Sequence, residues 1–409
     1  MPAAPLAHHA TLPGIDLPGS VDTVINWGLG VDSTAMIARI LEDPAAHGVD
    51  LERTAVVHMA TGSEWPDTLA DAERHMLPLL RKHGVRLVQL ARAGQSDQAG
   101  IEVLDDSRTP QRLAVRGSWT LWDELEVNGT VPQQGGTRRC SLRAKGHVGD
   151  RWILSATGGR PFVQMMGFNA DEAGRAVKDA TASSNPLRAG RFPLIDWGWG
   201  RQDCENYLFQ RFGIRWKKSY CWFCCFPVSM GAMEANLQRM RVFPDIAGRV
   251  LRLEYVATAL NPRAKLFGKR SLLEQFDPDV PGDRPVLEAF ARELDCPWAL
   301  YRVRRILRVA KDDPARRAPA MRSVEQLDLG TRARVGRRLE RISARRGVPV
   351  ETDPAYGMVR AWVRRRREVL PTVEELMVTA PAYVRDKQRR SFEAEWAAHI
   401  GRLAALPVG

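Results

Sequence analysis

The stretch VDTVINWGLGVDSTAMIARIL (residues 21–41) contains the signals of a strand, a turn and a helix in that order. Val21–Trp27 is rich in β-branched and apolar residues and predicts a short buried strand. Ala35–Leu41 carries apolar residues at helical spacing and predicts a helix. Gly28–Thr34 joins the two as a tight turn, which directs backbone N–H groups and the positive end of the helix dipole at one point. The stretch therefore predicts a phosphate-binding turn.

Three more strand candidates follow along the chain. Thr54–Met59, Val85–Leu90 and Phe162–Gly167 are short apolar runs, and a helix is expected from Pro66 to about residue 82. Strands and helices that alternate at this spacing imply a parallel twisted sheet with right-handed crossovers and helices on both faces. We therefore expect an α/β domain over residues 21–229.

The pattern changes after about residue 230. Apolar residues recur there at helical spacing, over residues 286–309, 324–346, 355–369 and 373–406. We expect an all-helical, basic domain over residues 230–409. Residues 1–20 are rich in Pro, Ala and His and are expected to form a flexible arm.

The excess of positive over negative charge lies in the last quarter of the sequence. The chain has 60 basic and 48 acidic residues, a net charge of +12, and residues 300–409 hold 25 of the basic and 13 of the acidic ones. This asymmetry predicts a polyanionic partner, DNA or RNA, with arginines contacting phosphates. A solvated arginine-rich face is the equally weighted alternative. The candidates are Arg337, Arg338, Arg341, Arg345, Arg346 and the run Arg364–Arg367.

Composition excludes several classes of protein. No apolar run reaches the roughly 20 residues that span a bilayer, so no membrane partner is expected. The first residues lack a cationic start followed by an apolar core, so a secretory signal is not expected. Six cysteines in 409 residues are too few for a disulfide scaffold, which favours a reducing, cytoplasmic location.

Five motifs follow the turn in order. They are Thr61–Pro66, Arg138–Lys145, Gly167–Glu172, Pro193–Trp197 and Cys221–Cys225. With the turn, this ordered set resembles the phosphoadenosine phosphosulfate reductase-like family of N-type ATP pyrophosphatases, over about residues 21–229. The resemblance implies an adenine nucleotide α-hydrolase-like fold that binds ATP with Mg²⁺.

The resemblance also implies a set of site residues. Asp32 would repel phosphate unless it faces a metal ion or the ribose side of the nucleotide, which suggests Mg²⁺-nucleotide chemistry. Asp32, Ser33 and Lys145 are the expected catalytic residues. The expected nucleotide-binding residues are Gly28, Leu29, Gly30, Val31, Asp32, Ser33, Thr34, Met59, Thr61, Gly62, Gly167, Asn169 and Glu172.

The chain departs from the family pattern at several positions. Gly28 and Leu29 replace the first two residues of the family's Ser-Gly-Gly-x-Asp-Ser loop, so one hydroxyl contact to pyrophosphate is missing. Asn169 stands where the family often has Arg. The Glu-Cys-Gly motif of true sulfonucleotide reductases is absent from the sequence, which argues against reductase chemistry.

The cysteines form a second candidate site. Cys221-x-x-Cys224 with adjacent Cys225 places two or three sulfurs within reach of one metal, and Cys140 lies far away in sequence. In the related adenylylsulfate reductases, cysteines at the matching places hold a 4Fe–4S cluster, and the resemblance implies one here. A zinc site and uncoordinated thiols remain alternatives. Cys204 and Cys296 are expected to be packed core thiols.

These observations predict an ATP pyrophosphatase that adenylates an acceptor for sulfur transfer in nucleic-acid modification. In this respect the chain is similar to the sulfurtransferase component of DNA phosphorothioation systems, and a sulfur donor such as a cysteine desulfurase is an expected partner. Two alternatives remain: a reductase of phosphoadenosine phosphosulfate or adenylylsulfate, and a non-catalytic nucleotide-binding regulator whose loop has decayed.

Overall fold

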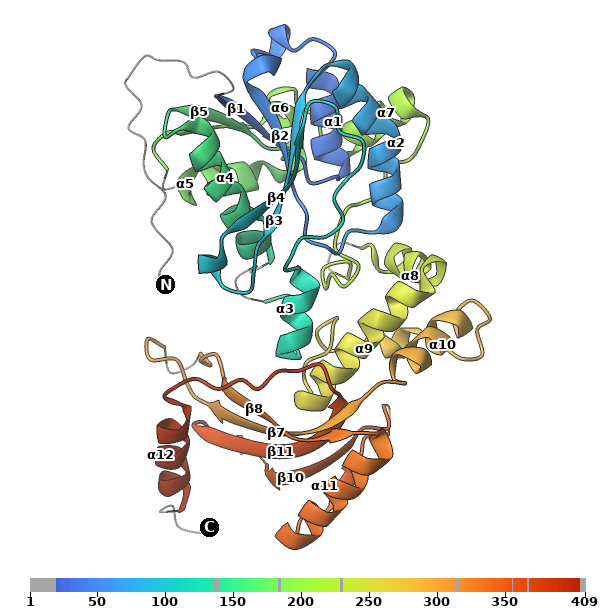
Figure 1. Cartoon of the computed structure of the whole chain (residues 1–409), viewed down its shortest axis with the longest axis vertical. Helices are drawn as coiled ribbons and strands as arrows, with labels where there is room; N and C mark the ends of the chain where they lie inside the picture. The colour runs from blue at the N-terminus through green and yellow to red at the C-terminus, as the bar shows by residue number, and fades with distance from the viewer. Residues whose placement is uncertain are drawn as a thin grey trace. The chain divides into compact units, whose positions relative to one another are not determined.

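A computed structural model describes residues 20–135, 138, 140–182, 185–228, 231–313, 316–354, 356–365 and 368–404 (Figure 1). The predicted N-terminal arm lies outside the described residues, apart from Ser20. The chain divides into two compact units. The first takes residues up to 122 and 137–221, and the second takes residues 123–136 and 222–409.

The first unit contains a six-stranded sheet in the order β4-β3-β2-β1-β5-β6. All neighbouring strands are parallel except β3 and β4. The predicted α/β fold with a mostly parallel sheet is therefore confirmed. The strands are β1 (Thr23–Asn26), β2 (Thr54–Met59), β3 (Arg86–Arg92), β4 (Ile101–Ser107), β5 (Phe162–Met165) and β6 (Arg188–Arg191).

Helices pack on the sheet because alternate strand residues point to opposite faces. Ile25 of β1 packs in one core cluster with Met36 and Leu208, whereas its neighbour Val24 packs in another with Val148. The helices of this unit are α1 (Val31–Ile40), α2 (Pro66–Lys82), α4 (His147–Thr157), α5 (Ala173–Ala182), α6 (Pro193–Asp196) and α7 (Arg201–Phe212).

Strand β1 lies where the strand order reverses. The chain passes from β1 to β2 and β3 on one side, whereas β5 and β6 lie on the other side of β1. In open parallel sheets, ligands bind outside the carboxyl ends of the strands at such a switch point. The turn that follows β1 is placed there by the topology.

The second unit contains a five-stranded antiparallel sheet in the order β8-β7-β11-β10-β9. Its strands are β7 (Trp298–Leu307), β8 (Met321–Gly330), β9 (Val350–Thr352), β10 (Val359–Arg364) and β11 (Thr372–Pro381). Its helices are α8 (Met233–Val242), α9 (Pro244–Leu260), α10 (Arg284–Glu293), α11 (Arg332–Arg346) and α12 (Phe392–Ala404), with most of α3 (Leu121–Asn128).

The prediction of an all-helical C-terminal domain is therefore wrong. Charged residues of β7 suggested the polar face of a helix, but they are paired across neighbouring strands. Arg302 Nε lies 2.7 Å from Glu375 Oε1, and Arg305 forms an ion pair with Glu374; both glutamates are on β11. A strand with buried ion pairs lacks the simple alternation that identifies strands from sequence.

Residues 123–136 belong to the second unit although they precede much of the first. Arg252 of α9 lies 2.6 Å from Glu126, and Arg322 of β8 donates to the carbonyl of Gly129 at 3.4 Å. These are long-range contacts that no local pattern predicts. No helix in the described part of the chain is long and apolar enough to cross a membrane.

Candidate functional site

The turn after β1 exposes the start of helix α1. Helix α1 begins at Val31, and its N-cap residue Gly30 is extended and makes no side-chain cap hydrogen bond. The N–H groups of a helix's first turn have no intrahelical partner, and the helix dipole adds partial positive charge there. The sequence thus leaves this helix start uncapped by a side chain, and an anion is its natural partner.

Leu29 has an unusual backbone conformation. Its φ is +59°, the one positive φ among the described non-glycine residues, and its side chain is fully buried. This conformation costs an L-residue about 1–2 kcal/mol, which burial of the leucine side chain offsets. Its carbonyl accepts a hydrogen bond from Trp216 Nε1 at 3.0 Å. Leu29 therefore adopts the backbone conformation that glycine favours at this position.

Hydroxyl groups hold the turn in place. Ser33 Oγ accepts from the Gly28 N–H at 3.2 Å, and Ser219 Oγ donates to the Gly28 carbonyl at 2.8 Å. Thr34 is buried, and its Oγ1 accepts from Trp27 Nε1 at 3.0 Å. Of the two hydroxyl residues of the turn, Ser33 is therefore the one that faces the loop. Val31 is also buried, so like Thr34 it offers only its backbone.

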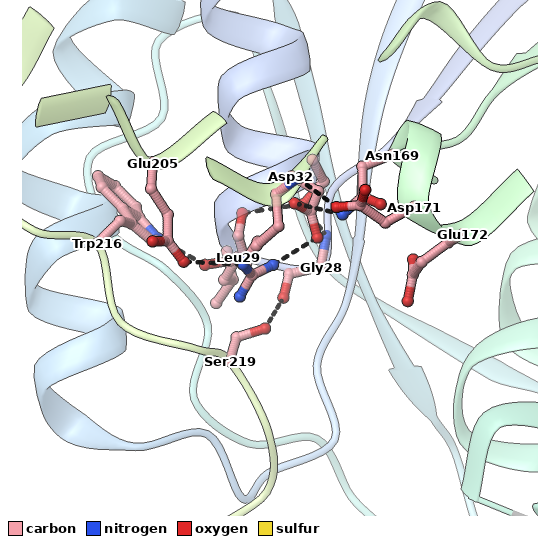
Figure 2. Close-up of polar contacts among 12 residues, drawn as sticks. Gly28, Leu29, Asp32, Asn169, Asp171, Glu172, Glu205, Trp216 and Ser219 are labelled. Carbon is pink, nitrogen blue, oxygen red and sulfur yellow. Dashed lines mark hydrogen bonds and ion pairs between the residues drawn. The ribbon is translucent and has the colours of Figure 1, made fainter. Parts of the chain in front are cut away.

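Asp32 lies between an amide and a guanidinium group (Figure 2). Its Oδ2 lies 2.6 Å from Arg201 Nη1, and its Oδ1 accepts from Asn169 Nδ2 at 3.2 Å. Burial raises the pKa of Asp32, although Arg201 and Asn169 oppose the shift. Arg201 is fixed further by Glu205 Oε1, 3.0 Å from its Nε, and by Asp171 Oδ2, 2.8 Å from its backbone nitrogen.

Asn169 is the least satisfied residue of this network. It is 3% exposed, and its Oδ1 has no hydrogen-bond partner among the residues that the structure describes. A buried carbonyl oxygen without a partner costs about 1–3 kcal/mol. This atom is therefore suited to a ligand that brings a hydrogen-bond donor or a cation to the Asp32 side of the loop. Nearby Glu172 forms an ion pair with Arg175 at 2.8 Å.

Gly167 allows β5 to approach the start of α1. A Cβ atom on Gly167 would lie 2.8 Å from both the Cα and the backbone nitrogen of Ser33. Real Cβ atoms do not approach so closely, so any side chain would displace the helix start. The close approach brings Gly167 and Asn169 beside the turn.

The predicted residues after β2 form a separate polar cluster. Thr61 donates to Glu64 Oε1 through its backbone N–H at 2.9 Å and its hydroxyl at 2.7 Å. Burial opposes ionisation of Glu64, but His58, the Thr61 hydrogen bonds and Lys145 together hold its pKa below the ordinary value. Lys145 is thus electrostatically coupled to this cluster. Met59 ends β2, and Gly62 has a φ of +77°.

The cysteines fall in both units. Cys140, which begins a π-helical turn (Cys140–Gly146), and Cys221 belong to the first unit, and Cys224 and Cys225 belong to the second. Cys221 Sγ lies 3.4 Å from Thr61 Oγ1. Among the residues that the structure describes, no group of three or more His, Cys, Asp or Glu side chains is arranged to hold a metal ion.

Cys204 is fully buried, as expected of a core thiol. Burial and the nearby Asp32 raise its pKa to about 12, so it stays protonated at neutral pH. It supports the site by packing and carries no charge into it.

Sequence reasoning missed three residues that contact the turn or Asp32. Arg201 is the first residue of α7, and Trp216 and Ser219 follow that helix. Only the glycines before Arg201, at 198 and 200, mark the start of a helix in the sequence. The contacts with the turn arise from tertiary packing.

No family model, no curated protein and no solved structure matches this chain. Its function is therefore inferred from the residues and their geometry.

Proposed function

We propose that the first unit is an ATP pyrophosphatase that transfers AMP from ATP to an acceptor, for sulfur transfer in nucleic-acid modification. One observation carries the proposal: the uncapped start of α1 lies at the switch point of the sheet, beside Asp32, Arg201 and the unpartnered Asn169 Oδ1. An anion site next to oxygen ligands for a cation suits a nucleotide with Mg²⁺.

Each group has a role in this proposal. The N–H groups of the first α1 turn and the Arg201 guanidinium hold phosphate oxygens, and Ser33 adds a hydroxyl. The carboxylate of Asp32 and Oδ1 of Asn169 are the hard oxygen donors that Mg²⁺ prefers. Magnesium, when bound, neutralises phosphate charge. The residues present therefore fit the cation.

The proposed reaction is an in-line displacement. An acceptor oxygen attacks the α-phosphorus of ATP, the bond from that phosphorus to the bridging oxygen breaks, and pyrophosphate leaves. Backbone N–H groups and Arg201 stabilise the charge that develops, which is the main task of the protein in phosphoryl transfer. Hydrosulfide, released from a donor persulfide by a thiol reductant, then attacks the activated acceptor; the new bond to sulfur forms as AMP leaves with the electrons of the broken bond.

Pyrophosphate release tests the proposal. The purified chain with ATP and Mg²⁺ is expected to release pyrophosphate and to do so faster with a nucleic-acid duplex present. Sulfite release from a sulfonucleotide with a thiol donor would support the reductase alternative instead. Tight ATP binding without turnover under both conditions would support the regulator.

The lack of room for a side chain at Gly167 leads to a mutational prediction. Gly167→Ala is expected to weaken ATP binding by at least roughly tenfold, because the added Cβ pushes the start of α1 away from its phosphate-binding position. Titration calorimetry measures the effect. Gly174→Ala is the matched control, since a Cβ there meets nothing within 4 Å. Equal affinities for the two variants would contradict the proposed phosphate position.

The cysteines give a separate prediction, which rests on their spacing. Anaerobic purification is expected to yield iron, sulfide and a broad absorbance near about 400 nm, because cysteine-bound clusters absorb there. Cys221→Ser is expected to reduce the iron content, and Cys296→Ser is expected to leave it unchanged. If the wild-type protein contains zinc and no sulfide, the result would contradict the iron–sulfur cluster and support a zinc site.

A further inference from the structure

Most arginines of the C-terminal sheet are already neutralised. Arg304 of β7 lies 2.5 Å from Glu393 Oε1, and Arg308 lies 2.6 Å from Glu395. The Arg302 and Arg305 pairs described above neutralise two more. These side chains stabilise the unit and are not available to an external anion.

Helix α11 differs from the sheet in this respect. Its 15 residues include seven arginines, one glutamate and no lysine. Val335, Leu339 and Ser343 are buried on its inner side, where the helix packs on the sheet of the second unit. The opposite side of α11 is left to charged residues.

Three exposed arginines follow one another on that opposite side. Arg337, Arg341 and Arg345 are spaced four residues apart, so they line one face of the helix with a rise of about 6 Å between them. Arg338 lies beside them and is half-buried. Among the described residues, none of these four forms an ion pair. We name Arg337, Arg341 and Arg345 the α11 stripe.

Helix stability does not account for the α11 stripe. Like charges at a spacing of four residues destabilise a helix by a few tenths of a kcal/mol per pair. Arg332 and Arg334 also lie at the helix start, where the dipole disfavours positive charge. Arg334 is compensated by Asp328 at 3.1 Å, whereas the α11 stripe has no such partner in the described part of the chain. An external anion would relieve the repulsion.

The chemistry of the stripe selects among polyanions. Its guanidinium groups form bidentate hydrogen bonds to phosphate, which ammonium groups cannot do. A helix that binds a lipid surface inserts large apolar side chains, but the apolar residues Val335 and Leu339 of α11 are buried in the unit's own core. A row of arginines without an apolar flank matches the phosphate backbone of a nucleic acid.

We infer that the α11 stripe binds the phosphate backbone of a nucleic-acid duplex without reading its sequence. The inference deepens the proposed function, because it names the surface that holds the acceptor. Phosphate contacts position a duplex and carry no sequence information. The stripe therefore predicts salt-dependent binding that is indifferent to sequence.

The test measures binding of a fluorescent 30-base-pair DNA duplex by anisotropy, without ATP, over a range of salt concentrations. The variant replaces the stripe by Arg337→Gln, Arg341→Gln and Arg345→Gln together. Loss of three phosphate contacts is expected to reduce the slope of log K against log salt by about 2.7 and to weaken binding at least roughly tenfold at low salt. Two duplexes of unrelated sequence are expected to give the same result.

A matched control removes the same charge elsewhere in the second unit. Arg263→Gln, Lys269→Gln and Arg270→Gln change three exposed residues in one segment. Equal weakening in the control would mean that diffuse charge, and not α11, binds the duplex, and would overturn the inference. Binding to phosphatidylserine vesicles with none to DNA or an RNA duplex would also overturn it. Thermal melting verifies that both variants fold.

ATP binding separates this inference from the proposed function. The stripe variant is expected to bind ATP as the wild-type chain does, because the nucleotide residues lie in the first unit. If the chain binds ATP but not the duplex, only the inferred role of the α11 stripe is refuted. A chain that binds the duplex and never ATP would refute the proposed pyrophosphatase and leave the α11 surface in place.

Discussion

Replacing Asp32 with Asn is expected to lower ATP turnover by at least roughly 100-fold and to tighten the binding of magnesium-free ATP by roughly tenfold. The carboxylate lies at the start of α1 and pairs with Arg201 at 2.6 Å. Without Mg²⁺ it repels a triphosphate and occupies the arginine. The isosteric amide removes the repulsion and frees Arg201, but it is a poor ligand for the cation.

Two measurements check this prediction. Pyrophosphate release gives the turnover, and calorimetry in the presence of a chelator gives the affinity for free ATP. Asp106→Asn is the control, because it breaks an ion pair of similar length, 2.8 Å to Arg86, elsewhere in the first unit. Unchanged turnover would exclude Asp32 from the chemistry. Weaker binding of free ATP would contradict the electrostatic account.

The central strands of the first sheet could be predicted because they are buried on both faces. The centres of β2 and β3 are therefore mostly apolar, with Ala55–Val57 in β2 and Leu87, Val88, Leu90 and Ala91 in β3, and a sequence displays this directly. β6, with the sequence RAGR, lies at the edge of the sheet and is largely exposed, so it has no apolar pattern. Pairing with β5 makes it a strand, and pairing is a long-range property.

The sheet of the second unit was not predicted because its strands contain buried ion pairs. In β7 and β11 arginines and glutamates face one another: Arg305 and Glu374 are buried directly opposite each other and form an ion pair. Viewed along one segment, each charge indicates a solvent-exposed face. The partner that makes burial tolerable lies about 70 residues away in the sequence, and only the register of the two strands brings it close.

The candidate site also contains residues that could be predicted from the sequence and residues that could not. Gly30, Asp32 and Asn169 directly follow strands β1 and β5, and the carboxyl ends of parallel neighbours meet at one edge, so their proximity follows from the topology. The left-handed backbone of Leu29 does not follow, because leucine rarely adopts it. Arg201 does not follow either, since α7 reaches the turn through tertiary packing alone.

Arg201 is the second residue whose replacement has a large expected effect. Arg201→Gln is expected to weaken binding of ATP with Mg²⁺ by roughly 10- to 100-fold, because the first α1 turn then lacks a guanidinium for phosphate. Asp32 also loses its ion-pair partner. The cost in stability is expected to lie below the about 3–5 kcal/mol of a fully buried pair, since the Arg201 side chain is 29% exposed.

Arg211→Gln provides the matched control for Arg201. Arg211 lies on the same helix and pairs with Glu42, so its loss removes one charge and one ion pair without touching the turn. We expect this variant to bind ATP normally. Equal weakening by both substitutions would assign the effect to the packing of α7 and not to a phosphate contact.

The double variant Asp32→Asn with Arg201→Gln separates attraction to phosphate from neutralisation of Asp32. If Arg201 only neutralised the carboxylate, then removing both would restore binding of magnesium-free ATP to the level of Asp32→Asn alone. If Arg201 also contacts phosphate, as proposed, the double variant binds free ATP more weakly than Asp32→Asn by roughly tenfold. Calorimetry on the four proteins of this cycle distinguishes the two outcomes, because the coupling between the residues is measured directly.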